Sequence, residues 1–152
     1  MSVAVGRASP ADAKRLAPLF DRYRVFYGQP SDPARALAFL DERLRRGEWV
    51  VLLAEADGEL QGFTQLFPSF SSVFTARSWV LNDLYVEAAA RRRGVAAALL
   101  GAAAAFARDT GALRLELETD HDNHAAQALY RRLGWHAHDG TLRFRLPLPE
   151  RA

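Results

Sequence analysis

Cysteine is absent from this chain of 152 residues, and lysine occurs once, as Lys14. Without cysteine the chain forms no disulfide, no thiolate metal site and no cysteine nucleophile. It also lacks any apolar run near the roughly 20 residues that cross a bilayer, and it lacks the basic-then-apolar start of a secretory signal. We therefore expect a cytoplasmic protein with no membrane partner.

An excess of charge of one sign is also missing, because the formal net charge is only +2. That balance provides no electrostatic field for nucleic acid, and we expect no such partner. The four histidines gather late in the chain, without ligand spacing or a completing carboxylate set: His121, His124, His136 and His138. We expect no metal site.

The length and composition are those of one soluble domain spanning residues 1–152. Hydrophobic residues make up 49% of the chain and charged residues 25%, which is ordinary for a globular protein with a buried core. We find no internal repeat and no linker.

Helical periodicity or helix boundary residues mark four segments. Their starts carry a capping residue or a glycine, followed in two cases by proline: Ser9 with Pro10, Ser31 or Asp32 with Pro33, Gly94, and Asn123. Three of them end at a glycine: Gly28, Gly47 and Gly134. The sequence therefore predicts two N-terminal amphipathic helices, an alanine-rich helix and a short C-terminal helix.

Strand patterns occupy most of the remaining chain. Two apolar runs flank Asp57-Gly58, which is a strong hairpin signal. The other predicted strands are Ser2–Arg7, Ser78–Val86, Ala112–Thr119 and Thr141–Leu148. The order is β, α, α, β, β, β, α, β, α, β, and it predicts an α/β fold with a mixed sheet and helices on both faces.

Three arginines and a glycine precede the alanine-rich helix, as Arg91, Arg92, Arg93 and Gly94. A helix begins with unpaired N–H groups and about half a positive charge. Because Gly94 has no side chain and the next turn is mostly alanine, these amides stay open to an anion, and the arginines add charge. A solvated basic turn would explain the same residues.

The pattern Arg91-x-x-Gly94-x-Ala96 follows "LNDLYV" and precedes "ALYRRLGW". This combination resembles the GNAT superfamily of N-acetyltransferases from about Trp49 to Trp135, and within it the polyamine and thialysine acetyltransferases. The resemblance implies the family's acyl-CoA N-acyltransferase fold, with a mostly antiparallel sheet in which two parallel strands splay apart.

The resemblance also implies acetyl-CoA as co-substrate. Its pyrophosphate would lie on the amides of the signature loop, around Arg92, Arg93, Gly94, Val95, Ala96 and Ala97, with Arg91 beside them. Its pantetheine would run along the backbone of Leu84, Tyr85 and Val86, and Asn123 would bond it as well as capping a helix. The amine would attack the thioester directly, with no covalent enzyme intermediate.

The resemblance makes Tyr130 the candidate catalytic residue, because in many family members the tyrosine of this "LY" pair reaches the thiol sulfur, where it would protonate the leaving thiolate. A packing role is the alternative. Tyr130 stands five positions before Trp135, and with Gly134 this spacing predicts the hydrophobic contact of a Schellman motif.

A general base is not evident. The related "LEDLYV" strand has a glutamate near the substrate amine where this chain has Asn82, which cannot accept a proton from an ammonium. We expect Asp83 to point to the opposite face of a regular strand, as a structural carboxylate. Glu118, with Glu116, is a candidate for orienting the amine, although pairing with arginine would also explain both.

The acceptor side is expected in "YRVFYG", where Tyr23, Phe26 and Tyr27 form an aromatic wall suited to a cationic amine. A simple core stripe is the alternative. An apolar segment with Phe67, Phe70 and Phe74 suggests a lid or a dimer contact, and small enzymes of this family often pair, so a homodimer is expected.

The leading hypothesis is an acetyl-CoA-dependent N-acetyltransferase acting on a small primary amine, such as a polyamine or a lysine analogue. The alternatives are a protein or peptide N-acetyltransferase, and a non-catalytic acyl-CoA-binding regulatory module. Loss of the family glutamate at Asn82 favours the regulatory module, whereas retention of Tyr130 favours an enzyme.

Overall fold

The computed structural model describes residues 2–150. They fall into two compact units, one ending at Glu118 and the other beginning at Thr119. The expectation of a single domain over residues 1–152 stays a prediction.

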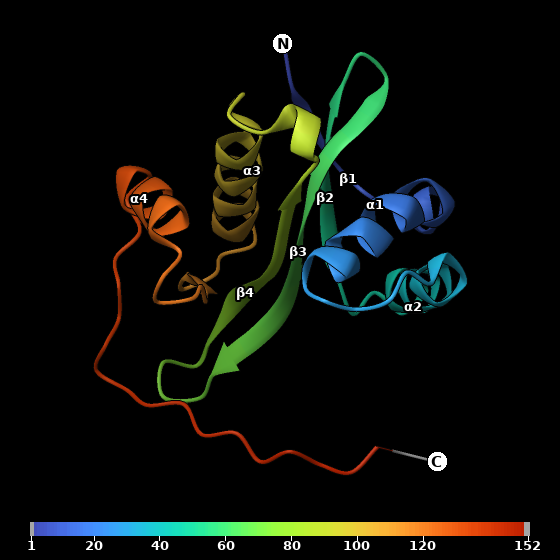
Figure 1. Cartoon of the computed structure of the whole chain (residues 1–152). Helices are drawn as coiled ribbons and strands as arrows, with labels where there is room; N and C mark the ends of the chain where they lie inside the picture. The colour runs from blue at the N-terminus through green and yellow to red at the C-terminus, as the bar shows by residue number, and fades with distance from the viewer. Residues whose placement is uncertain (1, 151–152) are drawn as a thin grey trace. The chain divides into compact units, whose positions relative to one another are not determined.

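The first unit is built on a five-stranded sheet, in the order β1-β2-β3-β4-β5. Neighbouring strands are antiparallel except β4 and β5, which are parallel (Figure 1). The mixed, mostly antiparallel sheet is therefore confirmed. The strands are β1 (Ala4–Arg7), β2 (Val50–Ala56), β3 (Glu59–Ser71), β4 (Ala76–Val86) and β5 (Leu115–Leu117).

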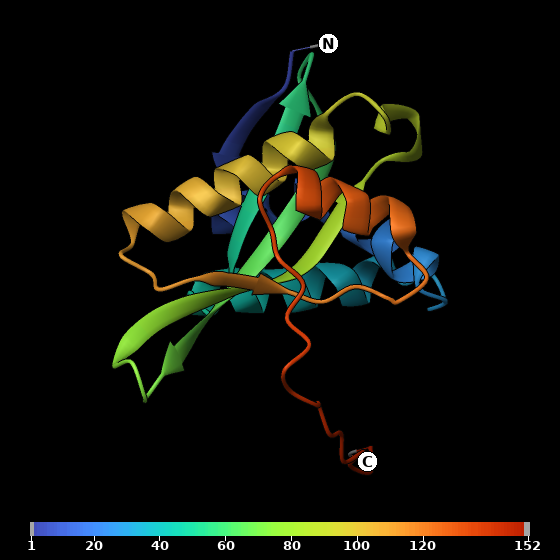
Figure 2. The same cartoon turned by 90° about the vertical axis from the view of Figure 1, so that its left-hand side faces the viewer.

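Helices cover both faces of this sheet, as predicted. α1 (Ala13–Phe26) and α2 (Pro33–Arg46) lie on one face, and α3 (Val95–Asp109) crosses the other (Figures 1 and 2). The α1–α2 face encloses a core that includes Leu16, Leu40 and Phe63, all at most 1% exposed. Burial of these large side chains is the main stabilising term for this layer.

The boundaries of α2 follow from its sequence. The Asp32 side chain accepts a hydrogen bond from the Arg35 backbone N–H at 3.1 Å, so Asp32 rather than Ser31 is the cap. Pro33 occupies the first position, and Gly47 ends the helix with φ of 65°, a left-handed conformation that favours glycine. The start of α1 differs from the prediction: Ser9 opens a 3₁₀ turn, Pro10–Asp12, and the α-helix begins only at Ala13.

The predicted hairpin turns at Asp57-Gly58, where φ is 53° and 78°. Both values are positive, as a type I′ turn requires. β4 begins two residues earlier than predicted, at Ala76, because it pairs with the long β3. β5 is shorter than the predicted Ala112–Thr119, because its pairing with β4 covers only three residues.

The α3 face is held by a close approach of helix and sheet. Trp79 stacks edge-on against Phe106 at 4.9 Å between ring centroids, and its indole N–H donates to the Thr110 hydroxyl at 2.9 Å. At Gly62 a Cβ would lie 2.6 Å from the Tyr85 carbonyl oxygen, so only glycine fits there without a shift of the backbone.

The second unit contains α4 (His124–Arg132), capped by Asn123, whose side-chain oxygen accepts from the Ala126 N–H at 3.2 Å. The predicted strand Thr141–Leu148 is wrong: that segment has no regular secondary structure. A strand is stabilised by pairing, and the described residues of this unit contain no strand with which this segment could pair. Its alternate apolar side chains are exposed, Leu142 by 85% and Phe144 by 90%.

Among residues 2–150, no helix is long and apolar enough to cross a bilayer.

Candidate active site

An irregularity in β4 shapes the candidate site. Gln65 of β3 pairs with Asp83, and the next residue, Leu66, pairs with Leu81, so Asn82 is an extra residue in β4. Such a β-bulge shifts the strand's alternation by one position. The pairing of β4 with β5 ends at the same place, at Leu81 and Leu117. From Asn82 to Val86, β4 therefore runs on beyond its parallel neighbour.

The bulge also turns backbone groups toward the side that β5 has left. Before it, Trp79 N–H donates to the Arg114 carbonyl at 3.1 Å, so the odd-numbered residues face β5. After it, the Asp83 carbonyl accepts from the Thr64 hydroxyl of β3 at 2.8 Å, and Glu87 N–H donates to the Gln61 carbonyl of β3 at 2.8 Å. By alternation, the backbone groups of Leu84 and Val86 point away from β3.

The three β4 residues that the resemblance implies as pantetheine-binding differ in the direction of their backbone groups. The backbone groups of Leu84 and Val86 face the unpaired side, where an extended ligand can add as a strand does. The Tyr85 carbonyl instead points to β3, against Gly62. Tyr85 therefore offers its ring, not its carbonyl, to the site.

Asp83 does not point to the face opposite Asn82, and that expectation is wrong. The Asn82 side-chain N–H donates to Asp83 Oδ1 at 3.3 Å, and the Tyr23 hydroxyl of α1 donates to the same oxygen at 2.6 Å. The bulge is the reason, because it places two successive side chains on the α1 face of the sheet. Asp83 is only 7% exposed.

Burial and hydrogen bonding shift the pKa of the Asp83 carboxylate in opposite directions. Desolvation raises the pKa of Asp83 above its ordinary value, and the hydrogen bonds from Tyr23 and Asn82 only partly offset it. The pKa of the Tyr23 phenol is raised strongly, first by burial and then by the neighbouring Asp83 charge. Tyr23 therefore stays protonated and remains a hydrogen-bond donor at every ordinary pH.

A second buried polar side chain lies across from Asp83. Gln65 is 0% exposed, and its side-chain nitrogen and oxygen have no hydrogen-bond partner among the described residues. Opposite residues of an antiparallel pair share a face, so the Gln65 amide is on the α1 side with Asp83. Leaving an amide unpaired costs about 1–3 kcal/mol. Sequence reasoning missed Gln65, which reads there as one polar residue in an apolar strand.

The predicted aromatic wall is present as a run of ring contacts. Tyr23 meets Tyr27 at 5.1 Å, Phe63 at 5.5 Å and Tyr85 at 5.9 Å between centroids, and Phe26 meets Tyr85 at 6.3 Å. Phe26 and Tyr27 are each 62% exposed. The rings thus lead from solvent at the end of α1 to the buried Asp83. Their role as an acceptor wall rather than a core stripe stays a prediction.

Arg91 joins this wall to the end of β4. Its Nε donates to the Val86 carbonyl at 3.0 Å, and its guanidinium carbon lies 5.5 Å from the Phe26 ring centre and 5.7 Å from that of Tyr85. These cation–π contacts hold the arginine over the rings. Arg91 therefore contacts the aromatic rings of Phe26 and Tyr85 as well as standing next to the signature loop.

The signature loop has the open helix start that the sequence predicts. Gly94 caps α3 with φ of 81°, and the first helical hydrogen bond runs from Ala98 N–H to the Gly94 carbonyl. The N–H groups of Val95, Ala96 and Ala97 therefore precede the helix ladder. Arg92 and Arg93 are exposed beside them, and Val95 is buried against the sheet. This turn can hold an anion of the size of a phosphate.

In the second unit, Tyr130 makes the packing contact of the Schellman motif. Trp135 N–H donates to the Tyr130 carbonyl at 3.0 Å, and the two rings lie 6.1 Å apart. That alternative for the ring is confirmed, while its role as proton donor stays a prediction. The Asn123 side-chain oxygen is used in the helix cap.

The remaining predicted positions add little to the site. Glu118 is exposed at the end of the first unit. Glu116 pairs with Arg114 at 2.6 Å, which is the sheet-face pairing that sequence analysis left open. Phe70 and Phe74 are exposed at the β3–β4 hairpin, and the expected homodimer stays a prediction. Among residues 2–150, no three histidine, aspartate or glutamate side chains gather as a metal site.

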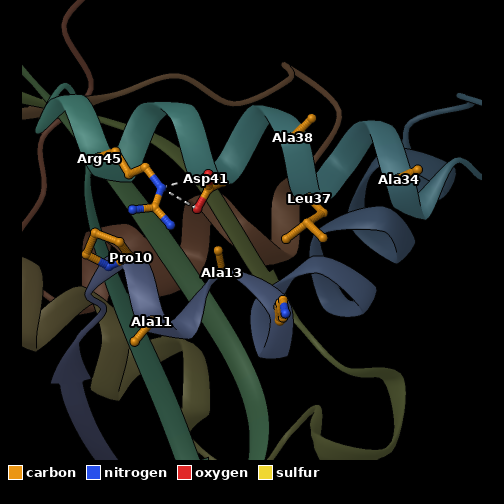
Figure 3. A pocket seen from close by; sticks show the side chains of 9 residues that line it. Pro10, Ala11, Ala13, Ala34, Leu37, Ala38, Asp41 and Arg45 are labelled. Carbon is orange, nitrogen blue, oxygen red and sulfur yellow. Dashed lines mark hydrogen bonds and ion pairs between the residues drawn. The ribbon is translucent and has the colours of Figure 1, made fainter.

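A groove of about 580 Å³ lies elsewhere, between the start of α1 and α2 (Figure 3). Its lining includes Pro10, Ala13, Leu37 and Asp41, and Asp41 is paired with Arg45. It contains no residue of the candidate site and no unpaired buried polar group. We assign it no function.

A sheet whose parallel pair parts beside an open helix start is the arrangement of an acyl-CoA-dependent N-acyltransferase. Comparison with known proteins identifies the family. Residues 15–135 match the acetyltransferase (GNAT) family model, and the chain belongs to that family. It is therefore an acetyltransferase of the GNAT type, a family that uses acetyl-CoA as co-substrate.

Individual relatives agree with the family assignment. The chain is 45% identical over 145 residues to the uncharacterized N-acetyltransferase YhfO of Bacillus subtilis, covering 95% of this chain and 97% of that protein. It is 31% identical to an aminoglycoside N(6′)-acetyltransferase type 1 of Stenotrophomonas maltophilia, covering 95% and 93%. A crystal structure of a probable acetyltransferase has 43% identity and a TM-score of 0.91, covering 97% and 99%.

Proposed function

We propose that this enzyme transfers the acetyl group of acetyl-CoA directly to a primary amine of a small molecule. The observation that carries the proposal is the aromatic wall that leads to a buried carboxylate at the bulge of β4. A cationic amine would be attracted by cation–π contact with the ring faces of Tyr23 and Tyr27 and by the negative charge of Asp83. The wall is short and built of rings, which suits an alkylammonium group.

One relative supports this class of acceptor. One relative of 31% identity that spans nearly the whole chain is named for the acetylation of an amino group on an aminoglycoside, a small cationic molecule. The net charge of +2 offers no extended surface of one sign for a basic or an acidic peptide. A small amine is therefore a better fit than a protein tail.

Acetyl-CoA would bind to backbone groups at the start of α3 and at the end of β4. The amides of Val95, Ala96 and Ala97 would bind the diphosphate of coenzyme A, with Arg92 and Arg93 adding charge. The backbone groups of Leu84 and the N–H of Val86, beyond the bulge, would hold the pantetheine and polarise the thioester carbonyl, where negative charge develops during attack. The Val86 carbonyl already accepts from Arg91.

Two further groups complete the proposed reaction. Tyr130 would give a proton to the leaving thiolate, and Asn123 would bond the pantetheine while capping α4. Both remain proposals that mutagenesis can test. A Tyr130→Phe enzyme that keeps full turnover at every pH would exclude the proton-donor role.

The test is a free-thiol assay with acetyl-CoA and a panel of amines: putrescine, spermidine, lysine, ethanolamine and kanamycin. A lysine-containing peptide serves as the comparison, and calorimetry measures acetyl-CoA binding alone. Thiol release with a small amine and not with the peptide supports the proposal. Release with the peptide alone would make the enzyme a peptide acetyltransferase. Binding without release from any acceptor would make it a regulatory acyl-CoA-binding module.

A further inference from the structure

Asp83 is the only carboxylate of the described residues that is both buried in β4 and adjacent to the aromatic wall. The polar residues that share this part of the sheet with it are Tyr23, Asn82 and Gln65. Asn82 stands where the related strand has its glutamate, and it has no proton-accepting group. The bulge brings the next side chain, Asp83, to the same face.

We propose that Asp83 is the general base of the reaction, taking a proton from the acceptor ammonium through Oδ2, while Tyr23 and Asn82 position it through Oδ1. This inference rests on the proposed function, because it names the residue that the proposed reaction requires. The glutamate of the related strand corresponds to Asn82, and its role would fall to the next residue, Asp83. This is possible because the bulge places both side chains on the same face of the sheet.

The hydrogen bonds leave one carboxylate oxygen available. Tyr23 and Asn82 both donate to Oδ1, and no donor to Oδ2 is found among residues 2–150. The fully buried side-chain atoms without a partner in that part of the chain belong to Arg24, Arg43 and Gln65. Asp83 Oδ2 is not one of them, and the Asp83 residue as a whole keeps 7% of its surface exposed.

The Gln65 amide is a second observation that points to a polar ligand here. It is fully buried, unpaired, and opposite Asp83 in the strand register. A buried amide without a partner is costly, and a bound amine or its water supplies both a donor and an acceptor. Gln65 is thus a positioning residue that would hold the incoming group beside Oδ2.

The acceptor ammonium loses two protons during the proposed step, one to Asp83 and one to the leaving thiolate. The ammonium gives one proton to the Asp83 carboxylate, and the neutral amine attacks the thioester carbonyl carbon with its lone pair. The C–N bond forms, the C–S bond breaks, and its electron pair leaves with sulfur. The second nitrogen proton reaches the thiolate, directly or by way of the thiolate's proton donor. Asp83 then releases its proton to water.

The surroundings favour this use of the carboxylate. Burial raises the pKa of Asp83, which makes it a better proton acceptor than an exposed aspartate. The titratable groups near it are Tyr23 and Tyr27 of α1 and Tyr85 of β4, and the Arg91 guanidinium lies over the Tyr85 ring. Gln65, from β3, carries no charge.

The test uses whichever panel amine releases most thiol with the wild-type enzyme, and it measures kcat/KM against pH for Asp83→Asn, Tyr23→Phe and Asp41→Asn. Asp41 is a partly exposed carboxylate of α2, paired with Arg45, and serves as the matched control. We expect Asp83→Asn to lose about 10²–10⁴-fold in kcat/KM, with acetyl-CoA binding unchanged. Asp41→Asn keeps the wild-type profile.

Tyr23→Phe distinguishes a tyrosine that tunes the Asp83 pKa from one that only packs. It also provides a test if Asp83→Asn fails to fold. The Tyr23 hydrogen bond lowers the pKa of Asp83, so its loss moves the acidic limb of kcat/KM to higher pH. A merely structural tyrosine would leave the limb in place.

A neutral acceptor gives a further check. Trifluoroethylamine is unprotonated at pH 7, so it needs no base to create its lone pair, whereas ethylamine does. The loss caused by Asp83→Asn is expected to be much smaller with trifluoroethylamine. An equal loss with both amines would assign Asp83 to binding and overturn its role as base.

The outcomes separate this inference from the proposed function. Wild-type thiol release with unchanged kcat/KM in Asp83→Asn would overturn the inference alone. No release from any amine by the wild-type enzyme would overturn the proposed function, and the inference with it.

Discussion

Replacement of Gly94 by alanine tests the open helix start against a control in the same helix. Gly94 has φ of 81°, and a residue with a Cβ pays about 1–2 kcal/mol in this left-handed region. Gly101 lies inside α3, exposed, with no atom within 4 Å of a Cβ built on it. The same Gly→Ala change therefore meets strain at one position and none at the other.

The strain in Gly94→Ala must appear in one of two measurements. If the turn keeps its geometry, the free energy of unfolding falls by about 1–2 kcal/mol. If the turn relaxes, stability recovers but acetyl-CoA must restore the geometry on binding, and its Kd rises by about 5–30-fold. The two losses together should come to about 1–2 kcal/mol. Gly101→Ala should raise stability by about 1 kcal/mol with no change in Kd.

Thermal or urea unfolding and calorimetry with acetyl-CoA measure both quantities for the two variants. If Gly94→Ala changes neither stability nor Kd while Gly101→Ala is stabilising as expected, the left-handed turn at Gly94 carries no strain and does not hold the ligand. A weakened Kd in Gly101→Ala would likewise contradict this role of Gly94, because no group near Gly101 faces the proposed anion site.

Two stability predictions concern the supporting frame. Gly62→Ala places a methyl 2.6 Å from the Tyr85 carbonyl oxygen, so we expect a loss of about 1–3 kcal/mol in urea unfolding; an unchanged midpoint would show that the strands separate freely. Asp21 accepts from the Ser31 hydroxyl at 2.6 Å and the Asp32 N–H at 2.7 Å, which lowers the pKa of Asp21. A lowered pKa stabilises the fold above the unfolded value of about 3.9 and loses that effect as pH falls through the folded value. Asp21→Asn should therefore lower the melting temperature at pH 7, and the difference should shrink in acid; a difference independent of pH would contradict this reasoning.

Local signals in the sequence predicted much of the frame. The Asp32 cap, Pro33 and Gly47 delimit α2 because capping and left-handed glycine are properties of a few neighbouring residues. The Asp57-Gly58 turn is of the same kind. Two interpretations of the site also followed from spacing alone, namely the open start of α3 at Gly94 and the ring contact of the Schellman motif.

The features missed depend on partner strands. A bulge in β4 exists only relative to its register with β3, so nothing in "LNDLYV" alone shows that Asn82 and Asp83 share a face. The presence of two polar residues in succession within an apolar strand is the one signal that could have suggested it. The segment Thr141–Leu148 has the alternation of a strand, but alternation does not supply a partner to pair with.

The central claim is that acetyl-CoA binds along β4 beyond the bulge and on the open start of α3. Amide-resolved NMR titration with acetyl-CoA tests it most directly. We expect the largest shift changes at the amides of Leu84, Val86 and Gly94–Ala97. Saturating changes confined to other amides, such as those of the groove between α1 and α2, would contradict it.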